Sequence, residues 1–330
     1  MRPGKERIDY TMKKAMDVLK SRAIYVFLLV MIIFFTVMNP NFLTVDNLLN
    51  VAKQVSIFGI ASVGMTYVIL LGGIDLSTGS LISFVNIITA YFMVNMGMNP
   101  WLAILLALLI STAIGFLNGW IIAEIKMPPL IVTFAAQTIF GGLAYIICNG
   151  RPISRFSDSF LKIGQGYLGP VPIPIIIMIV CFAVGGFILV KTYFGRYFYA
   201  LGGNEEAAEL SGIRVKKIKY LVYALSGLFA GIAGIVMLAR ANTAQPNAGL
   251  GYEFDVITCV VLGGVSVNGG SGKISNVIAG VLIIGVLNNG MILMDISSYM
   301  QMVVKGIILL LAVGSDCIQQ ANLLKAKKAA

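Results

Sequence analysis

The glycine-rich stretch Gly269–Ser275 is the part of the sequence that comes nearest to a nucleotide-binding motif. A phosphate-binding loop needs a further glycine five residues before the glycine that precedes the lysine, and Ser or Thr directly after the lysine. Val267 and Ile274 occupy those two positions here. We therefore expect that the chain does not bind ATP itself, and that any ATP and Mg²⁺ are bound by a separate subunit.

Side chains that usually carry enzyme or metal chemistry are scarce or scattered. The chain has no histidine, and its four cysteines are far apart in the sequence, at Cys148, Cys181, Cys259 and Cys317. This spacing indicates neither a zinc site nor a disulfide framework. A nucleophile-elbow motif and a paired-carboxylate pattern in a soluble pocket are also missing. We expect no catalytic residues, no metal and no cofactor in this chain, and hence a protein that is not an enzyme.

The polar loop Gly202–Lys219 has the features of a short exposed helix. Asn204 is a natural N-cap and Gly212 a natural stop. Between them stand strong helix formers, with acidic residues in the first turn, where they complement the helix dipole. The residues that we expect to contact a partner are Asn204, Glu205, Glu206, Ala207, Ala208, Leu210 and Gly212. A protein that only conducts needs no such helix, whereas one that a soluble motor pushes does.

The composition places this loop in an integral membrane protein. Of the 330 residues 58% are hydrophobic and 12% charged, about half the charged share of soluble domains. The sequence predicts an all-α, polytopic fold of about ten membrane helices, give or take one, because apolar runs of about the length that a bilayer requires recur along it. The runs are 23–39, 47–71, 78–96, 100–123, 129–149, 172–191, 219–240, 254–266, 274–294 and 298–315. The eighth is too short to cross alone, which predicts a broken, re-entrant or joined span.

The basic residues orient these spans. With both termini inside, 18 of the 24 Lys and Arg fall in inner segments, four in outer loops and two within spans. The positive-inside rule therefore predicts a cytoplasmic basic arm at 1–22, one membrane domain at 23–316 with the loop 192–218 inside, and a cytoplasmic basic tail at 317–330. Asn39-Pro40 follows the first span where a signal peptide would have a cleavage site, so we expect that span to be retained. The net charge of +10 comes from these segments, and nucleic acid is not expected as a partner.

Two glycine-containing stretches suggest a weak internal repeat. Val68–Ser80 aligns with Cys259–Ser271, which places the glycine pair Gly72 and Gly73 opposite Gly263 and Gly264. In transporters, glycine-interrupted segments at matching places in two halves point to the translocation path. The alternative is that each glycine pair simply ends a helix. The small-residue spacing Gly115-x-x-x-Gly119 and Gly227-x-x-x-Gly231 predicts close helix packing instead.

Polar side chains within the apolar runs fit two interpretations. They suit a route for a neutral, hydroxyl-rich molecule, and they equally suit hydrogen bonds between helices. The candidate path residues are Asn86, Asn118, Asn288, Asn289, Phe84 and Tyr299, with Gln137, Gln301 and Tyr145 nearby. For the charged residues we favour structural roles. Lys305 either snorkels outward or pairs with Asp255 or Glu253, in preference to contacting a substrate, and Asp75 caps the helix that follows it.

Several motifs resemble those of permease subunits of ATP-binding-cassette (ABC) importers. The run Glu206-Ala207-Ala208 followed by Gly212 resembles their motor-coupling loop. Permeases for ribose and related monosaccharides, such as galactosides and xylose, are similar from about Asn39 to Asp316, with ribose permeases most similar. That similarity is carried by Gly73–Leu81, Ala200–Gly212, Ser226–Gly227, Ala244–Gly251, Val261–Gly264 and Ser297–Lys305.

The resemblance implies a sugar importer in a bacterial cytoplasmic (inner) membrane. It implies a second permease copy or paralogue around a central path, an ATPase subunit with two nucleotide-binding domains that grips the short helix, and a secreted or periplasmic sugar-binding protein. That protein would dock on the outer loops 150–171 and 241–253. An ion-coupled secondary sugar transporter is the alternative, and it would need buried acidic residues or histidines. A passive channel or a polytopic enzyme would leave the cytoplasmic helix without a role.

Overall fold

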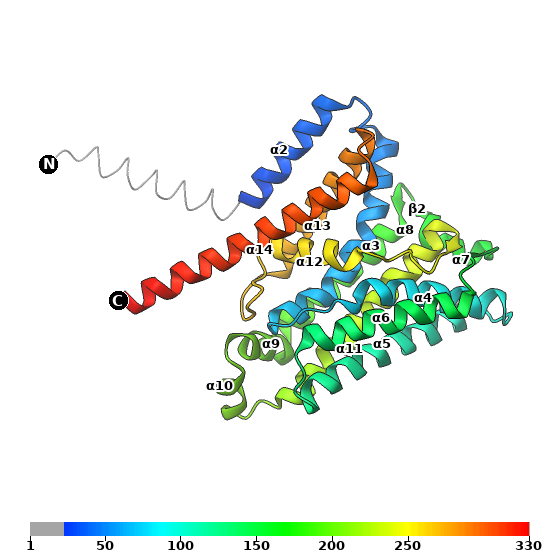
Figure 1. Ribbon diagram of the computed structural model, residues 1–330. Coiled ribbons are helices and arrows are strands. Elements are labelled where there is room, and N and C mark those ends of the chain that lie inside the picture. The colour runs from blue at the N-terminus through cyan, green and yellow to red at the C-terminus, as the bar shows by residue number, and fades with distance from the viewer. Residues whose placement is uncertain (1–22, 330) are drawn as a thin grey trace.

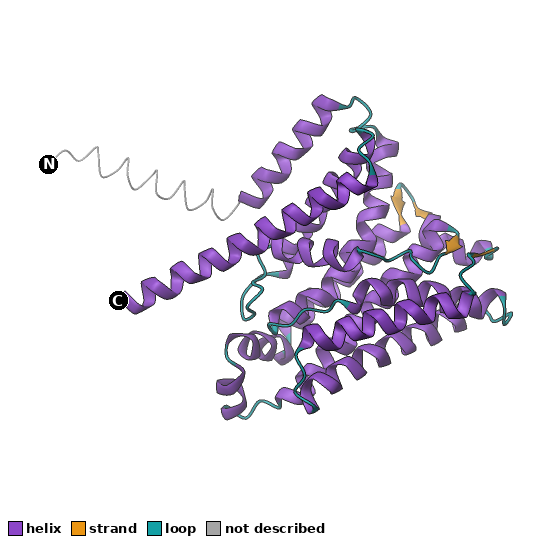
Figure 2. Ribbon diagram, viewed as in Figure 1, coloured by secondary structure: helices purple, strands orange, loops and turns teal. Residues whose placement is uncertain are grey.

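The computed structural model describes residues 23–329, and the predicted arm at 1–22 lies outside them. Helices make up nearly all of the described chain (Figure 2), and the four strands have two residues each. The helices are α2 (Ala23–Met38), α3 (Val45–Leu70), α4 (Ser77–Val94), α5 (Pro100–Glu124), α6 (Pro129–Cys148), α7 (Asp158–Gln165), α8 (Ile173–Lys191), α9 (Tyr193–Gly203), α10 (Glu205–Leu210), α11 (Val215–Ala241), α12 (Tyr252–Leu262), α13 (Ile274–Leu293) and α14 (Ser298–Ala329). The strands are β1 (Ile153–Ser154), β2 (Tyr167–Leu168), β3 (Val171–Pro172) and β4 (Thr243–Ala244).

A helix covers each of the ten predicted apolar runs, which confirms a polytopic, all-helical membrane protein. Among the described residues, eight helices are long and apolar enough to cross a bilayer. The other two runs form α2, with 16 described residues, and α12, with 11. The count of ten is therefore approximate, as the short eighth run led us to expect.

The helices pack as one bundle around α3. In Figure 1, α2 and α14 lie along one edge, α5 and α6 along the opposite edge, and α3 between them. Small residues bring α5 and α11 close together: a Cβ atom added at Gly115 would lie 2.2 Å from the carbonyl oxygen of Tyr223, and one at Gly227 2.3 Å from that of Ser111. The predicted packing role of these glycines is thus confirmed.

The two ends of the bundle carry different structures. At one end β1 pairs with β4, which joins the two predicted outer loops, and β2 pairs with β3 beside α7. At the other end lie α9 and α10 (Figure 1). The start of α2 and the C-terminal end of α14 also point to the α10 end, and α14 runs on through most of the predicted tail. A displacement at α10 must therefore pass along the helices before it reaches the loops at the other end.

Helix α12 is a half-span. Its 11 residues rise about 16 Å, roughly half of a hydrocarbon core. Before it comes an irregular segment, 245–251, that returns from β4 into the bundle, so the prediction of a broken or re-entrant eighth span is confirmed. Nζ of Lys305 on α14 lies 2.8 Å from Oδ2 of Asp255 on α12, which confirms the predicted ion pair and shows which of the two acids takes part.

Candidate functional site

Helix α10 is capped as the sequence predicts. The side-chain Oδ1 of Asn204 accepts a hydrogen bond of 2.8 Å from the backbone N–H of Ala207. Gly212 has φ +84°, in the left-handed region that glycine favours. Its N–H donates to the carbonyl of Glu209, and the N–H of Ile213 donates to that of Ala208, which closes the helix. Local sequence alone therefore specifies a six-residue helix with defined ends.

One face of α10 is left uncovered. The side of the helix that carries Ala208 is buried against the rest of the chain, and Ala208 itself is 5% exposed. Glu206 is exposed, and Leu210, one helical turn later, is 84% exposed. The outward face of α10 thus exposes one large apolar side chain beside carboxylates.

Helix α9 fastens α10 to the bundle through glycine. A Cβ atom added at Gly202 would lie 1.7 Å from the carbonyl oxygen of Leu70 and 2.5 Å from the backbone N of Gly270. At the neighbouring Gly203 the same atom would meet nothing within 4 Å. The N–H of Gly270 also donates a hydrogen bond of 2.9 Å to the carbonyl of Leu70. The end of α9, the end of α3 and the loop between α12 and α13 therefore meet backbone to backbone.

Two aromatic side chains reinforce this junction. The hydroxyl of Tyr199 donates a hydrogen bond of 2.8 Å to the carbonyl of Gly272. Burial raises the pKa of the Tyr199 phenol above its ordinary value, so the group remains a neutral donor. Phe198 is fully buried, and its ring packs against that of Tyr67, with the centroids 5.4 Å apart. The glycine-rich stretch Gly269–Ser275, which resembles a phosphate-binding loop in sequence, thus packs between α9 and the rest of the bundle.

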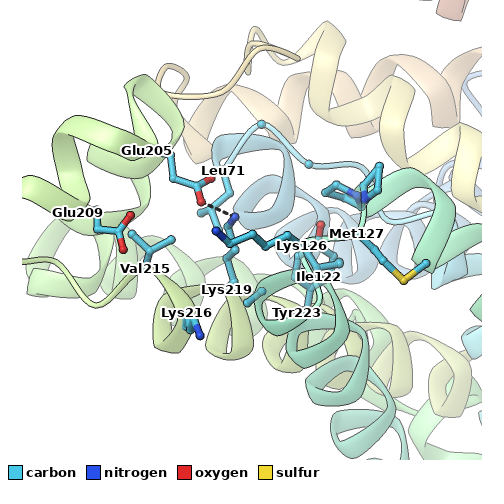
Figure 3. Close-up of a pocket in the computed structure, with 15 residues that line it drawn as sticks. Leu71, Ile122, Lys126, Met127, Glu205, Glu209, Val215, Lys216, Lys219 and Tyr223 are labelled. Atoms are coloured by element: carbon cyan, nitrogen blue, oxygen red, sulfur yellow. Dashed lines mark hydrogen bonds and ion pairs between the residues drawn. The ribbon is translucent and has the colours of Figure 1, made fainter.

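Helix α10 also borders a cavity of about 560 Å³ (Figure 3), which lies between the α5–α6 loop, the α3–α4 turn and the start of α11. Nζ of Lys219 forms an ion pair of 2.7 Å with Oε1 of Glu205 at its edge. A second ion pair joins Lys216 on α11 to Glu124 at the end of α5, with Nζ 2.6 Å from Oε2. The hydroxyl of Tyr220 donates a hydrogen bond to the same carboxylate. Sequence reasoning missed Glu124, because nothing local marks a partner 92 residues away.

The repeat glycines end two helices in the same way, one residue out of register with the sequence alignment. Gly72 and Gly264 both have φ +77°, although the alignment places Gly72 opposite Gly263. The N–H of Gly73 donates to the carbonyl of Val68, and the N–H of Val265 to that of Val260, as in a Schellman cap. The Gly72 turn lies beside the α9 junction, since an added Cβ at Gly269 would contact the backbone N of Gly72 at 2.7 Å and the carbonyl oxygen of Gly202 at 2.9 Å.

The structure does not bring the candidate path residues together. Asn118 donates a hydrogen bond of 3.2 Å to the hydroxyl of Ser77, and Asn289 exchanges hydrogen bonds with Asn47 on α3. Phe84 packs its ring on Phe140, with the centroids 5.2 Å apart. Asn86 and Asn288 are buried, and Tyr299 is 83% exposed at the start of α14. Hydrogen bonding between helices thus accounts for Asn118 and Asn289, and a path role for these residues stays a prediction.

Asp75 forms a buried polar cluster that the sequence showed only in part. Its Oδ1 accepts from the backbone N–H of Ser77, the first residue of α4, at 3.0 Å and from the hydroxyl of Ser77 as well. The N-cap residue itself is Leu76, so Asp75 bonds the start of α4 from one position before the cap. Its Oδ2 accepts a hydrogen bond of 2.7 Å from the hydroxyl of Ser226 on α11, and Asp75 therefore cross-links α4 and α11.

Comparison with known proteins agrees with this arrangement. A family model described as branched-chain amino acid transport system / permease component matches residues 47–313. The ribose import permease protein RbsC of Haemophilus influenzae is 45% identical over 296 residues, which are 88% of this chain and 91% of that protein. RbsC of Bacillus subtilis is 44% identical over 291 residues (88% and 90%). The L-arabinose transport system permease protein AraH of Escherichia coli is 40% identical over 281 residues (85% of each chain).

No solved structure matches the chain. The family match alone covers far more than half of the sequence, and it runs from within α3 to within α14, including the α9–α10 junction. The chain therefore belongs to the family of branched-chain amino acid transport system permease components.

Proposed function

We propose that this chain is the permease subunit of an ABC importer that moves a monosaccharide, ribose in the first instance, from the exterior or periplasm into the cytoplasm. Relatives named as ribose import permeases are 44–45% identical over 88% of the chain. The relatives named for L-arabinose are less similar, at 38–40%. This order supports ribose over arabinose as the first sugar to test.

The observation that carries the proposal is the exposed helix α10, which follows a helix, α9, that is packed backbone to backbone against the bundle. Its outer face presents Leu210 and Glu206, while Gly202 holds the preceding helix against the ends of α3 and of the α12–α13 loop. A separate ATPase subunit with two nucleotide-binding domains would grip one such helix on each of two permease copies and would bind the ATP and Mg²⁺. Closure of the ATPase on ATP would then shift α9 and tilt the helices attached to it.

The opposite end of the bundle suits a second partner. Pairing of β1 with β4 ties the two outer loops into one surface next to α7 and the β2–β3 hairpin (Figure 1). A secreted or periplasmic sugar-binding protein would deliver its sugar there. In this proposal the start of α2 and the end of α14 lie on the cytoplasmic side of the inner membrane, together with α10.

The test compares two leucines of similar exposure at opposite ends of the chain. Leu210 is 84% exposed on α10, and Leu168 is 70% exposed in the β2–β3 hairpin. Leu210→Ala is expected to weaken capture of the ATPase subunit and to reduce ATP-driven ribose uptake by vesicles at least fivefold. Leu168→Ala is expected to leave ATPase capture unchanged, since it lies at the other end. Full ATPase capture and uptake by the Leu210→Ala/Glu206→Lys double variant would disprove the proposed coupling.

A further inference from the structure

A small polar pocket lies where the half-helix α12 begins. The pocket has a volume of about 90 Å³, and its lining combines hydroxyl, amide and carboxylate groups from α4, α6, the segment before α12 and the first turn of α12. The polar side chains that matter here are Ser80, Ser83, Gln137, Asn247 and Glu253. Irregular backbone inside a membrane protein is tolerated where it is buried in protein or lines a cavity, and broken helices mark binding sites in transporters.

Glu253 lines this pocket, and one of its carboxylate oxygen atoms, Oε2, lies buried against Gly79 of α4. The residue is 1% exposed, and its Oε1 accepts a hydrogen bond of 2.9 Å from Nε2 of Gln137. Its Oε2 has no hydrogen-bond partner among the described residues, and no described Lys or Arg lies within ion-pair distance of it. Glu253 lies in the first turn of α12, where the positive end of the helix dipole stabilises a carboxylate. A buried carboxylate oxygen without a partner requires an explanation, and a donor that reaches it when α12 moves away from α4 would supply one.

Two hydrogen bonds fix the segment before α12 against α4. The hydroxyl of Ser83 already accepts from the N–H of Gly249 at 2.7 Å, and the side-chain oxygen of Asn86 accepts from the N–H of Gln245 at 3.2 Å. These bonds hold the segment 245–251 against α4, inside the bundle. The amide Nδ2 of Asn86, one turn beyond the pocket, has no acceptor in the described part of the chain.

The rim of the pocket opens on the surface of the subunit. Tyr145 is 48% exposed and Leu250 is 76% exposed, and a Cβ atom added at Gly141 would meet nothing within 4 Å. Gln137 lies about 12 Å along α6, near the middle of that helix. Polar groups at this depth face protein or water rather than lipid. A water-filled space at this face, such as one that a second copy would enclose, is what the proposal below requires.

From these observations we propose that the pocket at Glu253 binds the hydroxyl edge of the transported sugar, an inference that rests on the function proposed above. The carboxylate accepts hydrogen bonds from hydroxyl groups, while the amide and serine side chains both donate and accept. One carboxylate among neutral groups suits an uncharged polyol. The volume has room for a few water molecules rather than for a whole pentose, so the ring of the sugar lies in the adjoining space.

The position of α12 connects this pocket to the motor side. The helix carries Glu253 at its start and ends at the Gly264 turn, whose loop packs against Gly202 and Leu70. A shift of α9 therefore moves the pocket wall, and sugar contact and motor position change together.

The first test asks whether the carboxylate of Glu253 recognises a hydroxyl group of the sugar. Uptake of ribose and of 2-deoxyribose is compared in cells that contain the chain with its ATPase and sugar-binding partners. Glu253→Gln is expected to lower ribose uptake at least tenfold and to reduce the preference for ribose over 2-deoxyribose at least threefold. The sugar-binding protein is the same in both strains, so its own preference cancels. Asp46→Asn, which alters an exposed carboxylate at the start of α3, is expected to stay within twofold of the unchanged chain in both quantities.

The second test asks whether the rim faces water. In a Cys317→Ser background, Gly141→Cys is expected to react with a charged, membrane-impermeant thiol reagent at least tenfold faster than Gly142→Cys, and ribose is expected to slow that reaction. Neither glycine has neighbours that an added side chain would strike. Equal labelling of the two positions, with no protection by ribose, would overturn the proposal.

The outcomes separate the pocket from the overall function. If the unchanged chain moves no sugar, the proposed function fails. If it moves ribose while Glu253→Gln keeps both rate and preference, the pocket proposal alone fails. A requirement for sodium that Glu253→Gln removes would assign the pocket to a cation and would also overturn the sugar contact. Unchanged amounts of assembled complex in each strain exclude a folding defect.

Discussion

Replacing Gly202 with alanine tests the mechanical junction most directly. An added Cβ atom would lie 1.7 Å from the carbonyl oxygen of Leu70 and 2.5 Å from the N of Gly270. Non-bonded atoms rest at about 3.5 Å, so α9 must move away by roughly 1.5–2 Å. Overpacking of this kind costs about 1–3 kcal/mol, and loss of the hydrogen bond from Gly270 to Leu70 adds about 0.5–1.5 kcal/mol.

Gly203→Ala is the matched control, because the same atom meets nothing within 4 Å at the next residue of the same helix. Both changes gain a similar helix propensity, up to about 1 kcal/mol. The difference between the two variants should therefore be about 1.5–4.5 kcal/mol in free energy of unfolding. In detergent we expect Gly202→Ala to melt roughly 5 °C or more below Gly203→Ala. In vesicles we expect ATP-driven ribose uptake to fall at least tenfold for Gly202→Ala only.

The refuting result is specific. If Gly202→Ala matches Gly203→Ala in both melting temperature and uptake, the junction does not transmit force, and α10 must act through another contact. A lower melting temperature with full uptake would show that the contact stabilises the fold but does not couple it to the motor.

Three further predictions follow from single contacts. Asn204→Ala should remove the cap of α10, cost about 1 kcal/mol and weaken binding of the ATPase subunit several-fold in a titration, whereas Asn204→Asp should restore it. Lys305→Met should leave Asp255 buried without its partner and lower the melting temperature more than Lys305→Met/Asp255→Asn does, because a lone buried charge is worse than none. Gly115→Leu should push α5 away from α11, since its Cβ would lie 2.2 Å from the carbonyl oxygen of Tyr223. Size-exclusion chromatography in detergent measures the expected loss of folded chain. Gly141→Leu is the control, because a Cβ atom there meets nothing within 4 Å.

The features that the sequence predicted well are those that depend on interactions within a single segment. Span length and apolar content locate the membrane helices because the bilayer acts on each segment separately. The cap at Asn204 and the stop at Gly212 were likewise readable, since both act within one turn of α10. The shortness of the run 254–266 was enough to foresee a broken span.

What the sequence could not predict depends on residues far apart. The contact of Gly202 with Leu70 and Gly270 joins three segments that share no local pattern. Asp255 and Glu253 stand two positions apart on α12 and so point in different directions, yet only the packing of α14 shows that Lys305 takes Asp255. Asparagine is equally suited to a sugar route and to a hydrogen bond between helices, which is why composition could not separate Asn289 from a path residue.

The half-length of α12 gives a physical reason for coupling between its two ends. A helix that is hydrogen bonded along its whole length moves as a rigid rod over about 16 Å, and its far end is not anchored in the opposite loop region, as a full span would be. At the motor side, the rod ends in the loop that Gly202 and Leu70 hold. At the other end, Glu253 accepts a hydrogen bond of 2.9 Å from Gln137. Hydrogen bonds are lost beyond about 3.5 Å, so a shift of α12 well below 1 Å relative to α6 is enough to break this contact and present the carboxylate to a ligand.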